Sequence, residues 1–320
     1  MKIWKLSTVT MIGLTIVGCQ SKNSCPEGVV DETYVHRYGV QVDPEDWSSR
    51  GKHGKVISKM ADGVTVSRFY SAGELDGDTT YTFPHSEQIE IVHTYSLGTL
   101  VRELVNYRSG NPKKEMQYID DGRRQVVEWY EDGSKRFVEE YEGDFLATGE
   151  YYNGKKQIES RIDGGEGVRK NRDQYGQLES ADEIQDGELT LRTTFHPNGG
   201  PMEMIPFQNG KIQGQKRTYH PGGEPYTIEE WVDGEQHGDT VVYENGELKS
   251  RIVYQHGRKH GVEQVYRDGA AVVERVTWKD DELHGPRYQY VGDNTNIEWH
   301  YHGRKVNKNT YDRMSRAQVR

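Results

Sequence analysis

The sequence has few apolar residues, and none of its apolar runs is long enough to cross a membrane as a helix. Hydrophobic residues make up 33% of the chain, and its mean hydropathy is −0.93. A mostly apolar stretch, Leu6 to Gly18, has 13 residues and is interrupted by four hydroxyl side chains, whereas a transmembrane helix needs about 20 residues. It follows two lysines within the first five residues. We therefore predict that residues 1–18 are a secretory signal peptide that is removed after export.

The sequence also lacks the signatures of common enzymes. It contains no Gly-x-Ser-x-Gly, His-Glu-x-x-His or Cys-x-x-Cys, the patterns of serine hydrolases, zinc proteases and thiol redox sites. The segment from Gly149 to Lys155 has the spacing of a phosphate-binding loop, but Lys156 stands where magnesium requires Ser or Thr. A glycosidase needs two carboxylates in a cleft that gives them different pKa values. With 51 acidic residues, carboxylate pairs are expected by chance, and the sequence indicates no such cleft. We predict a protein that is not an enzyme and has no cofactor or metal.

Cysteine is scarce, because only Cys19 and Cys25 are present. Cys19 follows Ile16-Val17-Gly18 at the end of the apolar stretch, and this arrangement resembles a bacterial lipoprotein signal. The resemblance implies that Cys19 receives a lipid, and Gln20 after it favours the outer membrane of the cell envelope. The alternative is an ordinary signal peptide with a chance cysteine. With Cys19 lipidated, Cys25 has no partner for an intramolecular disulfide, so it is either unpaired or forms an intermolecular bond.

Positive charge is in deficit. The chain carries 41 Lys and Arg against 51 Asp and Glu, a formal net charge of −10 that becomes −12 once Lys2 and Lys5 leave with the signal peptide. The electrostatic field of a chain with this net negative charge repels nucleic acids and anionic lipid headgroups. We therefore expect no nucleic-acid partner.

Tyrosine and glycine are abundant, and they recur at regular intervals. Trp231, Tyr254 and Trp278 each precede a turn that ends in His-Gly, at steps of 23 and 24 residues. Between them, Tyr219, Tyr243, Tyr266 and Tyr290 recur with a similar spacing, each just before a glycine-containing turn. The same two-part pattern extends back to Trp47 and forward to Tyr301, so that 254 residues divide into eleven repeats of about 23.

Each repeat predicts a β-hairpin. Asn-Gly and Asp-Gly supply the positive φ angles that tight hairpin turns require. In the segment from Glu247 to Tyr254, Leu248, Ser250, Ile252 and Tyr254 share one face at a period of two. We therefore predict an all-β protein, an elongated single-layer antiparallel β-meander. Its unit is a strand, a tight turn, a second strand and a longer Asp-Gly-x-x-His-Gly loop.

The repeats resemble the MORN (membrane occupation and recognition nexus) motif in its variant bacterial form. The matching residues are the Gly-x-x-x-x-Tyr-x-x-Gly cores at Gly214–Gly222, Gly238–Gly246 and Gly261–Gly269, whereas the repeats between Gly77 and Gly187 lack several of the glycines. The resemblance implies a scaffold or binding surface. Some bacterial members are described as antitoxins or immunity proteins.

The sequence divides into four segments. After the signal peptide of residues 1–18 we predict a flexible tether over 19–46, the repeat array over 47–305 and a basic tail over 306–320. The tail contains Lys308, Arg313, Arg316 and Arg320. It is either a short helix that caps the array or a frayed tail.

Histidines at equivalent repeat positions do not predict a metal site. His237, His260 and His284 recur with the repeat, but equivalent residues lie two strands, or about 10 Å, apart, too far for three nitrogens to bind one zinc ion at about 2.0 Å. His300 and His302 lie two residues apart on one predicted strand without a third ligand. We expect these histidines to be ordinary loop and strand residues.

The aromatic rows are the most informative candidate site. Aromatic side chains on a half-covered sheet either form its packed face or bind a partner, since Tyr and Trp are enriched at protein interfaces. We predict a membrane-anchored binding or scaffold protein with a protein or peptide partner. The narrower alternatives are an immunity protein that neutralises a toxin and a structural lipoprotein that links membrane and cell wall. The candidate binding residues are Tyr219, Trp231, Tyr243, Tyr254, Tyr266, Trp278, Tyr290 and Trp299.

Overall fold

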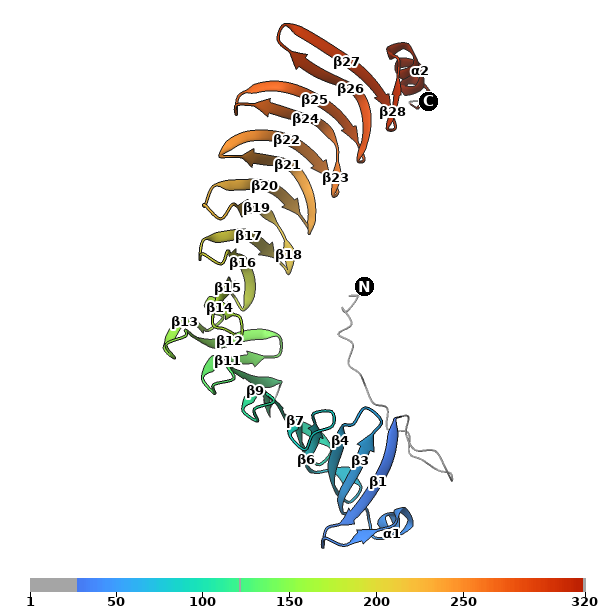
Figure 1. Cartoon of the computed structure of the whole chain (residues 1–320), viewed down its shortest axis with the longest axis vertical. Coiled ribbons are helices and arrows are strands. Elements are labelled where there is room, and N and C mark those ends of the chain that lie inside the picture. The colour runs from blue at the N-terminus through green and yellow to red at the C-terminus, as the bar shows by residue number, and fades with distance from the viewer. Residues whose placement is uncertain (1–27, 121, 319–320) are drawn as a thin grey trace. The chain divides into compact units, whose positions relative to one another are not determined.

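The computed structural model describes residues 28–120 and 122–318. These residues form 28 strands and two helices, with 66% of the chain in strands and 6% in helices. Neighbouring strands are antiparallel and connected by hairpins (Figure 1). The predicted all-β antiparallel meander is therefore confirmed. The signal peptide, Cys19 and Cys25 lie outside the described residues, and none of the described helices is long and apolar enough to span a bilayer.

The chain divides into two compact units, which we describe separately. The first contains the residues through Glu90 together with Tyr95–Thr99. Its strands pair as an antiparallel sheet in which β3 lies between β1 and β4. The elements are β1 (Val29–His36), β2 (Gln41–Val42), α1 (Pro44–Ser49), β3 (Gly54–Met60), β4 (Thr65–Ser71), β5 (Glu74–Leu75) and β6 (Gly77–Thr82), and β7 (Ile89–Ser96) contributes to both units.

Part of the predicted tether is folded. Residues 29–36 form β1, which pairs with β3, so flexible structure does not extend to residue 46 as predicted. Trp47, the first aromatic of the repeat pattern, lies in helix α1, because Asp43 caps the helix and Pro44 begins it. The Trp47 side chain is 5% exposed and packs against Tyr34 and Tyr70, with ring centres 5.7 and 6.3 Å away. This contact fixes β1 to the sheet.

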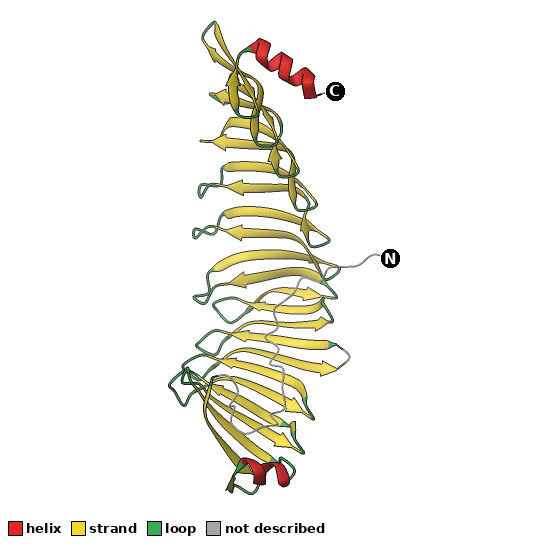
Figure 2. Cartoon of the chain, turned by 90° about the vertical axis from the view of Figure 1, so that its right-hand side faces the viewer, coloured by secondary structure: helices red, strands yellow, loops and turns green. Residues whose placement is uncertain are grey.

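The second unit contains Ile91–Thr94 and the residues from Leu100 onward. Its long hairpins succeed one another along the chain, and α2 follows the last of them (Figure 2). The elements are β8 (Thr99–Asn106), β9 (Pro112–Asp120), β10 (Arg123–Trp129), β11 (Lys135–Glu142), β12 (Phe145–Tyr152), β13 (Ile158–Asp163), β14 (Glu166–Arg172), β15 (Leu178–Gln185), β16 (Glu188–Phe195), β17 (Pro201–Gln208), β18 (Lys211–Ile212), β19 (Gly214–Tyr219), β20 (Pro225–Val232), β21 (Glu235–Glu244), β22 (Glu247–Gln255), β23 (Arg258–Lys259), β24 (Gly261–Arg267), β25 (Ala271–Lys279), β26 (Glu282–Val291), β27 (Asn294–Tyr301), β28 (Arg304–Val306) and α2 (Lys308–Gln318).

The longer loop of each repeat is more regular than predicted. Between β20 and β21, Asp233 and Gly234 have φ angles of +53° and +84° and form a two-residue turn, after which Gln236 pairs with Trp231. The irregularity comes later, as a bulge around Gly238, where φ is +107°. The His-Gly dipeptide at this position therefore belongs to a bulged strand, and the left-handed backbone accounts for its glycine.

The sheet of the second unit has two unlike faces. One face bears Thr240, Ile252 and Val276, which are only 4–7% exposed, and we call it the Thr240 face. The other bears Arg251, which lies between Val241 and Gln264 in register, and we call it the Arg251 face. Three exposed large apolar residues within strands β17–β27 lie on the Arg251 face, Val232, Val262 and Ile297, whereas the exposed Val291 lies on the Thr240 face.

The hydrophobic core of the second unit lies in the repeats that depart most from the glycine pattern. Leu146, Tyr151, Ile162 and Ile184 are 0–4% exposed and pack together. In the C-terminal repeats, by contrast, most strand side chains are half-buried. The repeats that are weakest as sequence motifs therefore contain the most tightly packed part of this unit.

Helix α2 covers the end of the last hairpin. Asn307 accepts a hydrogen bond from the Thr310 backbone N–H at 2.9 Å and so begins the helix. Tyr311 then packs on Trp299 and Tyr301, with ring centres 5.0 and 6.2 Å apart. Of the two alternatives for the tail, residues 308–318 form a helix.

Candidate binding face

Three of the predicted aromatics form a row on the Thr240 face. Trp231, Tyr254 and Trp278 are each paired in register with a glycine of the preceding strand: Gly214, Gly238 and Gly261. The three glycines have φ angles of +100°, +107° and +85°, a left-handed backbone that favours glycine, so the repeat keeps a glycine at a constant spacing from each aromatic. We call these three residues the aromatic row.

Carboxylates hold the aromatic row in position. The indole Nε1–H of Trp231 donates to Glu229 at 3.0 Å, and that of Trp278 donates to Glu263 at 2.8 Å. Lys259 Nζ lies 4.7 Å from the centre of the Trp278 ring and 3.8 Å from the Glu263 carboxylate. The rings are thus ordered by contacts within the chain.

Tyr254 lies in the same polar surroundings. Burial raises the pKa of its phenol, and the nearby charges of Glu263, Asp281 and Glu229 raise it further. The aromatic row therefore combines apolar ring surface with negative charge.

The other tyrosines form a second row at the opposite ends of the strands. Tyr219, Tyr243 and Tyr266 each follow a register shift beside a turn. The Tyr266 hydroxyl donates to Gln264 at 2.9 Å, and Tyr290 stacks on Tyr288 with ring centres 6.4 Å apart. The eight predicted residues are thus distributed over separate places and do not form one continuous site.

Trp299 lies on the opposite face from the aromatic row. The β26–β27 hairpin pairs continuously from Val291–Asn294 to Gly285–His300, without the bulge seen beside Tyr243 and Tyr266. As a result, His300 and not Trp299 pairs with Gly285, the position that an aromatic of the row occupies in other repeats. Trp299 therefore lies on the Arg251 face, where Tyr311 packs against it. Trp299 contributes to helix packing there.

The histidines form local pairs. The rings of His237 and His256 lie 5.2 Å apart, and those of His284 and His302 lie 4.8 Å apart. Burial lowers the pKa of His284, and the nearby His302 and Lys279 lower it further. His300 is 7% exposed. Within the part of the chain that the structure describes, no group of three or more metal-binding side chains is arranged to hold an ion.

The phosphate-loop spacing also belongs to a hairpin. Gly149 lies within β12, and the segment continues through a turn into β13. In that turn the Lys155 backbone N–H donates to Asn153 at 2.9 Å. The strand–turn–strand context differs from the strand–loop–helix context of a phosphate-binding loop.

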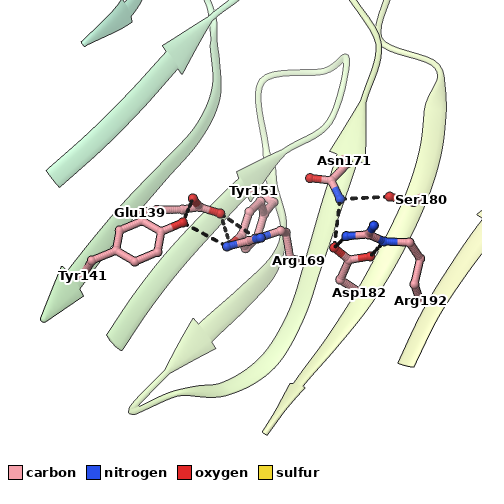
Figure 3. A network of polar contacts seen from close by, with 8 residues as sticks. All are labelled: Glu139, Tyr141, Tyr151, Arg169, Asn171, Ser180, Asp182 and Arg192. Atoms are coloured by element: carbon pink, nitrogen blue, oxygen red, sulfur yellow. Dashed lines mark hydrogen bonds and ion pairs between the residues drawn. The ribbon is translucent and has the colours of Figure 1, made fainter. Parts of the chain in front are cut away.

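A buried polar ladder on the Thr240 face is the main feature that the sequence did not indicate (Figure 3). Its first half surrounds Glu139, which is 5% exposed. The hydroxyls of Tyr141 and Tyr151 each donate to this carboxylate at 2.7 Å, and Arg169 Nε forms an ion pair with it at 2.9 Å. Arg169 also donates to the Tyr141 hydroxyl at 3.0 Å.

The second half of the ladder surrounds Asp182, which is 1% exposed. Arg192 donates to both of its carboxylate oxygens, at 2.7 and 2.8 Å. Asn171 donates to Ser180 at 2.9 Å and approaches Asp182 at 3.4 Å. Because Arg169 pairs in register with Asp182, four charges of alternating sign run across β11, β14, β15 and β16.

The ladder perturbs the ionisation of its members. Burial raises the pKa of Tyr141 to about 12, assisted by the charge of Glu139. Burial also raises the pKa of Tyr151, again with a contribution from Glu139. For Arg169, burial acts to lower the pKa, but the attraction of Glu139 outweighs it, so the pKa is raised and the guanidinium stays charged. The geometry of the ladder, with buried carboxylates held by cross-strand donors, is that of a structural support for the face.

A sequence signal for the ladder exists, but it is incomplete. Glu139 and Tyr141, Arg169 and Asn171, and Ser180 and Asp182 are polar pairs at a period of two. That period is also typical of a solvent-facing strand surface. Only the cross-strand partners show that these side chains satisfy one another.

No family model matches the chain, and no curated protein matches it. Among solved structures, it is similar to a chain of the Tc holotoxin pore of Photorhabdus luminescens, with 9% identity and a TM-score of 0.18. The match covers 85% of this chain and 23% of that one.

Proposed function

We propose that this protein is a lipid-anchored, non-enzymatic binding or scaffold protein of the bacterial cell envelope, with variant MORN repeats as its binding array. In this proposal a lipid on Cys19 holds the protein at the membrane, the outer membrane being favoured. The array then presents its surface to a protein or peptide partner.

The aromatic row is the observation that supports a binding role best. Its indole and phenol rings are half-buried, and both indole N–H groups donate to carboxylates of the same face. Because these rings are already ordered, binding a partner would cost the array little side-chain entropy, and such preorganisation favours affinity. Tyr and Trp are also the residue types most enriched among energetically dominant interface residues.

The anchor is tested by cell fractionation. A Cys19→Ser variant is expected to leave the membrane fraction, because lipid on this cysteine is the proposed attachment. The full chain stays in that fraction. Equal membrane association of both proteins would contradict the lipid anchor.

The binding role is tested by affinity capture from solubilised envelope membranes. We would compare the mature protein with two variants, Trp231→Ala/Trp278→Ala for the aromatic row and Tyr243→Ala/Tyr266→Ala for the second row of tyrosines beside the turns. A Tyr118→Ala/Tyr175→Ala variant is the matched control, since these tyrosines are 41% and 85% exposed and lie outside both rows. Loss of one partner with either row variant, with thermal stability and control capture retained, supports the proposal.

The outcomes also separate the narrower roles. Capture of a toxin-like protein would specify an immunity function, and co-sedimentation with peptidoglycan would specify a structural link to the cell wall. The proposal fails if the purified protein turns over a cell-wall or ester substrate and loses that activity on substitution of one carboxylate.

A further inference from the structure

The Arg251 face carries arginines in a single cross-strand row. The pairing register places Arg217, Arg251 and Arg275 along one line across strands β19 to β27. The complete line, which we call the arginine row, is Arg217, Ile228, Val241, Arg251, Gln264, Arg275, Tyr288 and Ile297.

The arginines of this row are exposed, and their own chain engages them weakly. The Arg251 side chain is 54% exposed and pairs with the partly exposed Asp239. Arg217 donates to Gln215 at 2.8 Å. Arg275 is exposed and forms no ion pair within the described residues. Exposed pairs of this kind contribute little to stability, so the guanidinium groups are available to a partner.

Apolar side chains lie between the arginines. Ile228 and Val241 separate Arg217 from Arg251, and beyond Arg275 the row continues with Tyr288 and with Ile297, which is 49% exposed. Val232 and Val262 add exposed apolar surface to the same face. The Arg251 face thus combines positive charge with apolar contact surface in a chain whose formal net charge is −10.

We propose that the arginine row docks an acidic, amphipathic segment of a protein partner. The proposal rests on the binding function proposed above and adds a contact surface on the face opposite the aromatic row, together with the partner's chemistry. Each arginine pairs with one carboxylate of the partner, and the partner's aliphatic side chains cover the apolar positions between them. This complementarity selects the partner and sets its register along the row.

The spacing favours a protein segment over a uniform polyanion. Adjacent strands lie about 4.8 Å apart, which separates Arg217 from Arg251 by about 14 Å and Arg251 from Arg275 by about 10 Å. A nucleic acid carries closely spaced phosphates and no aliphatic groups, and the net negative charge of the chain repels it. A segment with separated carboxylates and intervening aliphatic residues satisfies both kinds of position.

The test uses the full chain and a fluorescent peptide in which glutamate and leucine alternate. Binding is followed by fluorescence anisotropy for the native protein and for an Arg217→Gln/Arg251→Gln/Arg275→Gln variant. The matched control is Arg258→Gln/Arg267→Gln/Arg304→Gln, which removes the same charge from exposed arginines outside the row. We expect the row variant to bind about tenfold more weakly, because three exposed ion pairs are lost, and the control to bind within about twofold of the native protein.

Several outcomes would overturn the proposal. Equal weakening in both triple variants would show that only the general charge matters. A lysine–leucine peptide that binds as well as the glutamate–leucine peptide would contradict the predicted partner charge, and a DNA duplex bound through the row with greater affinity would point to a different class of partner.

The single variant Arg275→Gln separates a loss of binding from a loss of folding, because Arg275 forms no ion pair within the described residues. It should keep the native melting temperature and bind about twofold more weakly. If envelope capture succeeds but the row variant captures the same partner equally well, the binding function stands and the assignment of this face fails.

Discussion

Replacing Glu139 with glutamine should destabilise the middle of the array by removing the anion at the centre of the polar ladder. Glu139 is 5% exposed and receives two tyrosine hydroxyls and the Arg169 ion pair. Breaking one partner of a buried ion pair costs about 3–5 kcal/mol. The Arg169 side chain is 25% exposed, so water reaches it, and we expect about 3 kcal/mol, the lower end of that range.

Hydrogen exchange followed by mass spectrometry is the appropriate assay, because it reports local opening in a long repeat array. A loss of about 3 kcal/mol should accelerate exchange in β11–β14 by about 100-fold. The control is Asp239→Asn, which breaks an exposed pair and should change local stability by less than about 0.5 kcal/mol. Equal exchange in the two variants would refute the reasoning.

The double variant Glu139→Gln/Arg169→Gln separates charge from packing. Removing both charges leaves no uncompensated ion, so exchange should slow again relative to Glu139→Gln alone. Faster exchange in the double variant would show that Arg169 stabilises the face independently of Glu139.

Three further predictions concern the same region. Gly149→Ala would place a Cβ 2.6 Å from the Tyr151 hydroxyl, and we expect the displaced ring to cost about 2 kcal/mol in chemical denaturation; an unchanged midpoint would show that the ring adapts. In Gly167→Ala the new Cβ would lie 2.1 Å from a backbone oxygen at φ +145°, so soluble yield and melting temperature should fall, whereas Gly154→Ala, with open space around it, should leave both unchanged. The fold raises the pKa of Tyr141 to about 12. The stability that the protonated phenol contributes is therefore present below the unfolded pKa near 10 and is lost as pH rises through about 12. A Tyr141→Phe variant whose melting temperature declines as steeply as that of the native protein over this pH range would contradict this prediction.

Much of the fold was predictable because the repeat depends on the conformational preferences of a few neighbouring residues. Turn residues with positive φ, such as Asn245 and Gly246 at +53° and +79°, mark hairpins whatever surrounds them. The tether was predicted too long for the converse reason. Residues 29–36 carry no repeat glycine, and their strand depends on pairing with β3 and on the Trp47 contact with Tyr34.

The candidate site was only partly predictable. The row of Trp231, Tyr254 and Trp278 follows from the period of the sequence, because equivalent strand positions share a face. Trp299 has the same residue type but lies on the other face, because one hairpin lacks a bulge and its register shifts by one residue. A single-residue change of register cannot be read from aromatic spacing alone.

The sequence by itself determined the strands, their turns and the repeat, since these depend on backbone conformation and side-chain alternation over a few neighbouring residues. Tertiary structure alone decided which face holds the most buried side chains and which carries exposed arginines, and it brought Glu139 on β11 to Arg169 on β14. The physical reason is that register and cross-strand contact are properties of paired strands. Each strand taken singly shows only alternating side chains, and its charges acquire partners when the neighbouring strands are in place.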